Sequence, residues 1–246
     1  MLFHEEGRVV AQTPSGVISM AGDGAVRAAD GSTTEGGGAR TLDDSAAAAW
    51  CSALGGVITF GDDDGSSTDT WVFKAGSWKK LKVPKRPIGR TGAFAFESPD
   101  GVVLVGGTSS KGKPLHEHWR FDGKTWIGPE KLSGLSDEAL QTMGFDGARL
   151  VAVEVDRFTP DAPLEVRVLA LAGKKWVPLM QVPIRSSGVV GAAIDATTRE
   201  VVLVGALNGA FQISTLPLPA VAAPSKSESR APKKTSKRPA RTRRPT

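Results

Sequence analysis

The chain is built from short apolar runs, most of which end at glycine or another small residue. The clearest runs are GVITFGD at 56–62, GVVLVGG at 101–107 and EVVLVGA at 200–206, and weaker copies are GVISMAG at 16–22 and RLVAVEV at 149–155. Valine, leucine, phenylalanine, tryptophan and threonine favour a pleated, half-buried surface. Short strands separated by turn residues at regular spacing predict an all-β fold.

These runs recur with a loose period. They start at residues 16, 56, 101, 149 and 200, in steps of 40, 45, 48 and 51 residues. A pair of tryptophans recurs with them, because Trp71 and Trp78 are seven residues apart and so are Trp119 and Trp126, 48 residues further on. Trp176 marks a third copy that has lost its first tryptophan. The pattern predicts an array of similar structural units.

One repeat divides into four strands. GRTGAFAF at 89–96, GVVLVGG at 101–107, HEHWRF at 116–121 and KTWIGP at 124–129 are separated by turn-forming stretches rich in glycine, proline and serine. Four strands in a repeat of this length match one blade of a β-propeller. The glycine pair lets neighbouring backbones approach closely. The tryptophans are expected to pack between adjacent sheets, each burying ~150–250 Å².

The third repeat resembles the kelch repeat, in which a strand and a glycine pair are followed by a tryptophan, an aromatic residue and a second tryptophan. The residues that carry the resemblance are Gly106, Gly107, Trp119, Phe121, Asp122 and Trp126. The copy at 46–82 has Asp62 in place of the second glycine, the copy at 139–180 lacks the glycine pair, and the copies at 188–216 and 1–42 are weaker still.

The resemblance implies a kelch-like or galactose-oxidase-central-domain-like propeller of about five four-stranded blades. Kelch propellers usually have more blades, and the last repeat of this chain lacks its outermost strand. Three arrangements therefore remain open: a small five-bladed ring, an incomplete ring, or a chain truncated at its N-terminus. Galactose oxidase needs tyrosine copper ligands, and this chain contains no tyrosine. That activity is excluded, and no cofactor is expected.

The predicted propeller occupies residues 1–219, and a disordered basic tail occupies residues 220–246. Within the propeller, the stretch at 22–44 is expected to be the least ordered, because glycine and polar residues dominate it. Two short helices are alternatives to strands. One is SGLSDEALQTM at 133–143, with Ser136 as its cap, and the other is Ala46–Ala49.

Charge separates the two parts of the chain. Residues 224–246 carry nine lysines and arginines against Glu228 alone, a net charge of +8, whereas the whole chain carries +5 and residues 1–223 therefore carry −3. A nearly neutral body gives no electrostatic footprint for nucleic acid. The tail can bury little apolar surface, so it is predicted to be disordered and to contact polyanions non-specifically. Its contact residues would be Lys233, Lys234, Lys237, Arg238, Arg241, Arg243 and Arg244.

Composition and the N-terminal sequence argue against several other classes of protein. A single cysteine excludes an intramolecular disulfide framework. No apolar run is long enough for a transmembrane helix, so no membrane span is expected. The N-terminal MLFHEEGRVV has acidic residues where a signal peptide has its apolar region, so a cytoplasmic location is expected.

Few residues suggest site chemistry. His116 and His118 would share one face of a strand and could chelate a metal, with no third ligand assigned. The acidic run at 62–64 with Asp69 lacks the spacing of a calcium loop and is expected to be a solvated turn. Cys51 lies in an apolar context that favours a buried, inert thiol.

The function expected first is a non-enzymatic binding or scaffold module whose propeller loops contact a protein or a glycan. An enzyme of the kelch or galactose-oxidase-like group is the second hypothesis. It would need His116, Glu117 and Arg90 to converge at a pocket. A degenerate or fragmentary propeller without a selected activity is the third. The ligand, the closure of the ring and the oligomeric state stay open at this stage.

Overall fold

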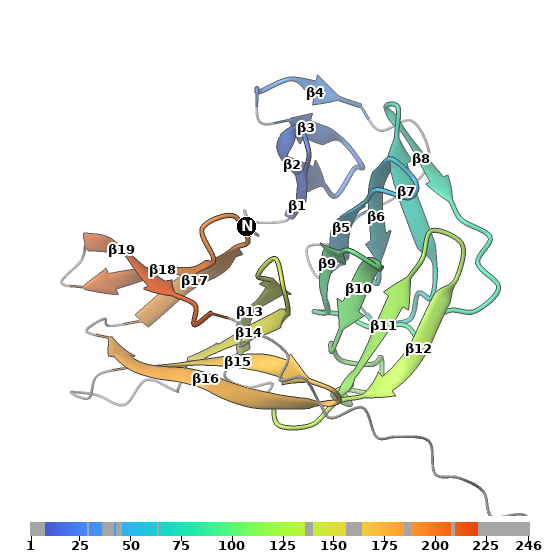
Figure 1. The fold of residues 1–246 in the computed structure, drawn as a ribbon. Helices are drawn as coiled ribbons and strands as arrows, with labels where there is room; N and C mark the ends of the chain where they lie inside the picture. The colour runs from blue at the N-terminus through green and yellow to red at the C-terminus, as the bar shows by residue number, and fades with distance from the viewer. Residues whose placement is uncertain are drawn as a thin grey trace, which may run out of the picture.

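The protein is a five-bladed β-propeller. The computed structural model describes residues 8–28, 30–35, 42, 46–62, 64–135, 140–155, 164–184, 188–207 and 210–220. These residues form strands and turns and contain no helix, and therefore no helix that could cross a bilayer. The five antiparallel sheets are arranged around a common centre, and the first strand of each sheet lies nearest to it (Figure 1). The predicted all-β propeller of about five blades is confirmed.

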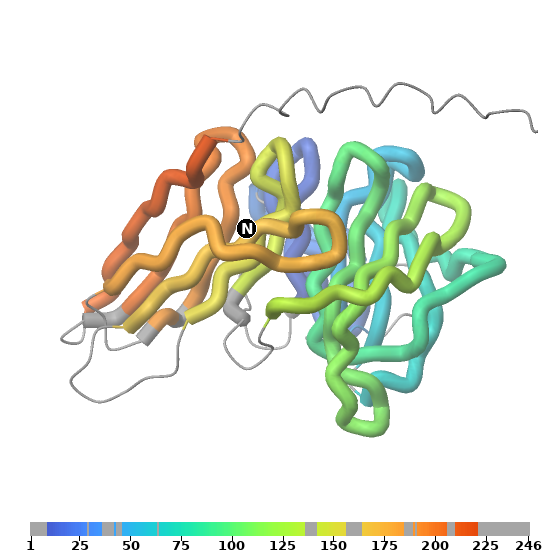
Figure 2. The backbone as a smooth tube through the Cα atoms, turned by 60° about the horizontal axis from the view of Figure 1, so that its bottom comes forward, coloured from blue at the N-terminus to red at the C-terminus, as the bar shows by residue number. Residues whose placement is uncertain are grey.

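Each sheet is a simple meander of consecutive strands. The first sheet consists of β1 (Arg8–Thr13), β2 (Gly16–Ala21), β3 (Val26–Ala28) and β4 (Thr33–Thr34), and the second of β5 (Ala47–Cys51), β6 (Gly56–Phe60), β7 (Thr70–Lys74) and β8 (Ser77–Lys80). The third sheet consists of β9 (Phe94–Ser98), β10 (Gly101–Val105), β11 (Glu117–Phe121) and β12 (Trp126–Lys131), and the fourth of β13 (Leu140–Phe145), β14 (Leu150–Val155), β15 (Leu164–Ala172) and β16 (Lys175–Ile184). The fifth sheet consists of β17 (Gly188–Asp195), β18 (Glu200–Leu207) and β19 (Ala210–Pro217). Figure 2 shows the sheets standing side by side, with their turns at two opposite ends.

The fifth sheet has three strands where the other four sheets have four. The sequence predicted this difference, because the last repeat ends without its tryptophan-bearing strand. As a result β19 is the outer edge of its sheet, and it pairs along its whole length with β18 on one side only among the described strands.

Four hydrophobic clusters fill the interfaces between consecutive sheets. They join the first sheet to the second, the second to the third, the third to the fourth, and the fourth to the fifth. In the described part of the chain no such cluster joins the fifth sheet to the first. The burial of apolar surface therefore holds the sheets together in chain order, from one neighbour to the next.

The tryptophans of the outermost strands lie in these interfaces. Trp78 belongs to the cluster shared with the first sheet, and its indole N–H donates a hydrogen bond to the Gly24 carbonyl at 2.8 Å. Trp126 packs against the second sheet in the same way and donates to Thr70 Oγ1 at 2.9 Å. Trp176 is buried against the third sheet. Each indole thus wedges its own sheet against the preceding one.

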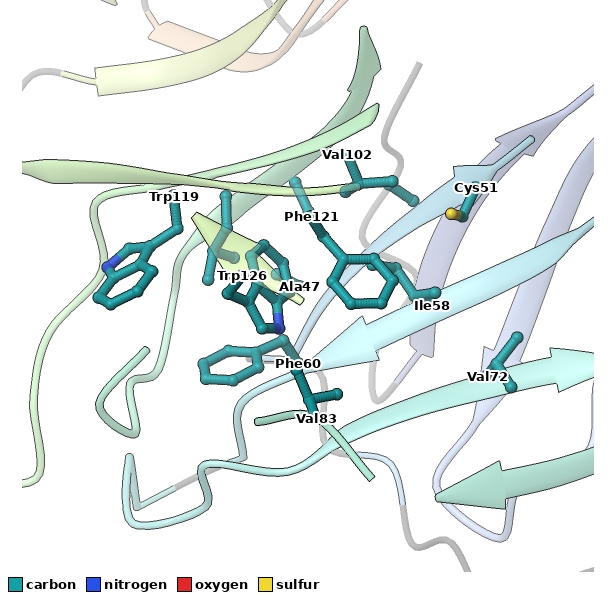
Figure 3. Close-up of a cluster of buried hydrophobic side chains, with 13 residues drawn as sticks. Ala47, Cys51, Ile58, Phe60, Val72, Val83, Val102, Trp119, Phe121 and Trp126 are labelled. Carbon is teal, nitrogen blue, oxygen red and sulfur yellow. The ribbon is translucent and has the colours of Figure 1, made fainter. Parts of the chain in front are cut away.

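The interface between the second and third sheets is the richest in aromatic side chains. The Trp126 ring lies between Phe60 of β6 and Phe121 of β11, with ring centroids 5.7 Å and 5.1 Å away (Figure 3). Tilted and edge-on ring contacts of this kind add about 0.5–1.5 kcal/mol to simple area burial. Trp119 belongs to the same cluster, whereas Trp71 is half-buried against the preceding interface.

The two short helices considered as alternatives were wrong. Ala46–Ala49 was considered as a short helix, but Ala47 begins strand β5, where its small side chains suit the crowded centre of the ring. The helix considered at 133–143 is contradicted at Leu140, which begins strand β13; residues 136–139 lie outside the described residues. Within the stretch 22–44, which was expected to be the least ordered, the described residues include the short strands β3 and β4.

Candidate functional site

A small pocket opens at the boundary between the third and fourth sheets, where loops from both meet. Its walls are mainly apolar and include Val105, Leu115, Leu132, Leu135 and Met143. Polar groups at its margin come from Thr108, His116, Glu117 and Ser133, and the cavity measures about 240 Å³. An apolar pocket with a few convergent polar groups is the usual form of a ligand-binding site, although this one holds only a small group.

The glycine pair after β10 shapes one wall of this pocket. Gly106 and Gly107 have φ angles of +67° and +88°, which other residues rarely adopt. A Cβ atom on Gly107 would lie 2.9 Å from the Thr91 carbonyl oxygen. The N–H of Gly106 donates to the Glu117 carbonyl at 3.0 Å, and the Gly107 carbonyl accepts from Leu115 at 2.9 Å. The sharp turn therefore brings the start of β11 back over the end of β10.

The Glu117 side chain is held by two hydrogen-bond donors, on the face of β11 that also carries Trp119. Its Oε1 accepts hydrogen bonds from Arg90 Nη2 and from Trp119 Nε1, each at 2.8 Å. Arg90 is fully buried, and it also donates to the carbonyls of Gly106 at 2.9 Å and Ile88 at 3.2 Å. The arginine therefore fixes both the carboxylate and the glycine turn in one orientation.

The two histidines lie in different surroundings. His116 lines the pocket, whereas His118 is outside its lining and lies 4.0 Å from Glu130, measured from Nε2 to Oε2. Burial lowers the pKa of His118, and the nearby Glu130 only partly opposes this effect. Among the described residues there is no group of three or more His, Cys, Asp or Glu side chains that could hold a metal ion. The predicted metal pair thus gains no third ligand from this part of the chain.

Arg90, Glu117 and His116 were predicted to converge if the chain were an enzyme, and they do so only in part. Glu117 and His116 share the pocket lining, and Arg90 contacts Glu117. Arg90 itself is shielded from solvent, and its described hydrogen bonds all go to protein oxygens. It acts as a support for Glu117, because it does not reach the cavity.

The remaining candidate site residues that the structure describes have structural roles. Asp62 and Asp64 accept hydrogen bonds from Ser67 N–H at 2.8 Å and Ser66 N–H at 2.7 Å, which folds the turn after β6. Asp69 forms ion pairs with Lys80 and Arg86. Cys51 is buried, and burial raises the pKa of its thiol, which disfavours the reactive thiolate. Asp63 and the tail residues from Lys233 to Arg244 lie outside the described residues.

A second cavity lies on the axis of the ring. All five first strands line it, through residues that include Gln12, Ala49, Ala95, Gly144 and Ala193. The cavity measures about 190 Å³. Small side chains dominate here because five strands converge on a narrow centre.

Sequence reasoning missed the apolar half of the first pocket. Leu132, Leu135 and Met143 come from the link between the third and fourth repeats, and no local pattern sets them apart from ordinary core residues. The only usable signal was the glycine pair, which marked the loop but not its partner across the interface.

Comparison with protein-family models and with curated proteins finds no match to this chain. The class that the structure defines is therefore the five-bladed β-propeller, and the kelch type stays a resemblance carried by the residues of the third repeat.

Proposed function

We propose that this protein is a non-enzymatic binding module that holds a protein or glycan ligand at the pocket between the third and fourth sheets. The observation that carries the proposal is an apolar cavity whose lining also includes the polar residues Thr108, His116 and Ser133. Arg90 and the start of β11 hold the turn at Gly106 and Gly107 by hydrogen bonds, so this wall of the cavity is formed before a ligand binds and the ordering cost of binding is small.

The lining restricts the chemistry of the ligand. Hydroxyl and imidazole groups beside leucine and methionine side chains suit a group with an apolar stem and hydrogen-bond donors at its tip, such as a lysine side chain of a partner protein or the hydroxyl-bearing face of a sugar. A cavity of about 240 Å³ would take one such group, with the surrounding loops contacting the rest of the ligand.

An enzyme that processes sugars is the second hypothesis, and it is less well supported. It needs an acid, a base or an electrophile that faces the cavity, and Arg90 is occupied by protein oxygens. The absence of tyrosine excludes the tyrosine–copper chemistry. A propeller without selected activity, the third hypothesis, would leave the pocket without a ligand.

The test is to block the pocket without disturbing Glu117. The exposed residue Ser133 lines the cavity, so Ser133→Phe should fill its mouth. The matched control is Ser77→Phe, an equally exposed serine at the start of β8 in the second sheet. Both variants and the wild-type protein would be applied to an array of lysine-containing peptides and to a glycan array.

The expected result is retention of the wild-type protein and of Ser77→Phe on a defined set of array spots, with loss of Ser133→Phe from the same spots. Equal retention of all three proteins would show that the pocket is not the contact site. No specific retention on either array would argue for the propeller without selected activity.

We also propose that the basic tail contacts nucleic acid or another polyanion. The supporting observation is its net charge of +8 within residues 224–246, beside a body of −3. The test compares DNA binding by the wild-type chain with a variant in which Lys233, Lys234, Lys237, Arg238, Arg241, Arg243 and Arg244 are glutamine. Binding should fall steeply with salt in the wild-type protein and be nearly absent in the variant, because counterion release drives it. Equal affinity in the two proteins would contradict the role of the tail.

A further inference from the structure

The outermost strands of the five sheets differ in how they are protected against pairing with other chains. Exposed sheet edges are usually blocked by charges, prolines, bulges or short length. β4 contains two residues, and β8 carries Lys79 and Lys80. β12 contains Pro129 and is paired through a bulge, and β16 contains Pro178 and is also paired through a bulge.

The outer edge of the fifth sheet has none of these protections over most of its length. β19 has the sequence AFQISTLP, with no charged residue and with its single proline at the last position. It pairs with β18 from Ala210 to Pro217 in unbroken register. It is therefore a long, regular and uncharged edge at the rim of the molecule (Figure 1).

This edge also exposes two large apolar side chains. Phe211 is 78% exposed and Ile213 is 74% exposed, more than any other large apolar residue in the described chain. They lie on the sheet face opposite to Leu203, because Ile213 pairs with Val204 and Phe211 pairs with Ala206. Leu203 is buried against the fourth sheet, so the two exposed side chains face away from that interface.

We infer that β19 is a docking edge for a second copy of this chain, with the two β19 strands pairing antiparallel about a two-fold axis at Gln212. In this register Phe211 of one copy lies directly opposite Ile213 of the other, on the same face of a continuous six-stranded sheet. An aromatic residue opposite a β-branched residue is a favourable cross-strand pair. In this register residues 210–214 of one β19 pair with residues 214–210 of the other about a single two-fold axis, so the dimer closes and does not grow further.

Charge favours a second copy of this chain as the partner of β19. A second copy of β8 would bring lysines together, whereas two copies of β19 bring no like charges together because the strand is uncharged. The basic tails follow the C-terminal ends of the strands. With antiparallel pairing about Gln212, the two Pro217 residues are ten positions apart, or about 34 Å along the strand axis. This exceeds the screening length of about 8 Å at physiological salt, so the two tails do not oppose pairing.

The experiment measures molar mass by light scattering during gel filtration of the full chain, over a wide range of protein concentration. The wild-type protein should reach twice the mass of one chain. Ile213→Lys should return the mass to that of one chain, because lysines of the two copies would face the new interface. Ile127→Lys is the matched control, since Ile127 is also exposed on an edge strand, β12, and this variant should remain dimeric.

Thermal unfolding of Ile213→Lys at low protein concentration distinguishes the loss of the dimer from damage to the fold. The side chain is exposed, so the variant should unfold at the same temperature as the diluted wild-type protein. A wild-type chain that stays at single mass overturns the inference, and so does a dimer that Ile213→Lys leaves intact. A single-mass wild type that Ile213→Lys destabilises would show that a segment of the same chain covers the edge, which also overturns it.

Discussion

The third and fifth sheets show what the outermost strand contributes to this propeller. The third sheet has four strands, and its last strand carries Trp126, which is buried against the second sheet. The fifth sheet has three strands among the described residues and exposes Phe211 and Ile213. Both sheets have buried inner strands. The inner strands therefore suffice to attach a sheet to its neighbour, while the fourth strand closes the outer part of the interface.

The largest effect on stability should come from removing the buried indole of Trp126 from the third sheet. Trp126→Ala is expected to lower the free energy of unfolding by about 3–5 kcal/mol, since it leaves a cavity between Phe60 and Phe121 and an unpaired Thr70 hydroxyl. Urea denaturation followed by circular dichroism measures the change. The neighbouring Ile127→Ala is the control, because that side chain is exposed and its loss should change stability by less than about 0.5 kcal/mol. Similar losses of stability in the two variants would contradict the role of Trp126 in the interface between the second and third sheets.

The fourth and fifth sheets depend on a polar contact in addition to their apolar cluster. The buried carboxylate of Asp146, after β13, accepts hydrogen bonds from Arg149 Nε and Arg199 Nη2, each at 3.1 Å. Arg149 Nη2 in turn donates to the Pro219 carbonyl at 2.7 Å. This network fastens the end of the described chain to both sheets, close to the point where the basic tail begins.

A medium effect is expected for Asp146→Asn, with a loss of about 2–3 kcal/mol at neutral pH, because two arginines lose their charged partner. The control is Asp195→Asn. Asp195 occupies the matching turn of the fifth sheet, where it accepts hydrogen bonds from the N–H groups of Thr197 and Thr198. A smaller loss is expected there. Equal losses would mean that the backbone hydrogen bonds matter and the arginines do not.

Acidic pH should remove the contribution that the Asp146 carboxylate makes to the free energy of unfolding. Burial alone would raise the pKa of Asp146, but its hydrogen bonds, including the one from Arg199, and the charge of Arg149 outweigh this effect and hold the pKa below the ordinary value of 3.8. The unfolded chain therefore takes up the proton first, and the stabilisation is complete above about pH 4 and is lost as the pH falls further. The stability difference between wild type and Asp146→Asn should shrink in that range. A constant difference down to strongly acidic pH would contradict this account.

The repeat pattern predicted the strands well because each one is marked locally. The runs GVITFGD and GVVLVGG correspond to β6 and β10, and the tryptophan-bearing segments correspond to the outer strands. The missing fourth strand of the fifth sheet was also visible, because no tryptophan segment follows β19.

Features that depend on neighbours were not visible locally. Alanine has the highest intrinsic helix propensity, but propensity differences are small per residue, so burial between two sheets overrides them in β5. The pocket was not predicted, since it joins Glu117 and Met143 across an interface that only the arrangement of sheets creates. Arg90 and Glu117 were singled out together as residues that would converge in an enzyme, and they do form an ion pair, but the sequence did not show that Arg90 would be buried as a support.

The smallest effect should come from the exposed apolar residue of the incomplete sheet. Phe121 and Phe211 both lie on the third strand of their sheet, but Phe121 is buried whereas Phe211 is 78% exposed. Phe211→Ala should change the free energy of unfolding by less than about 0.5 kcal/mol in dilute solution, because almost no contact is lost. Phe121→Ala should lose about 3–5 kcal/mol in the same urea titration. A large loss for Phe211→Ala in dilute solution would mean that this side chain is covered within a single chain, and the contrast between the two sheets would then disappear.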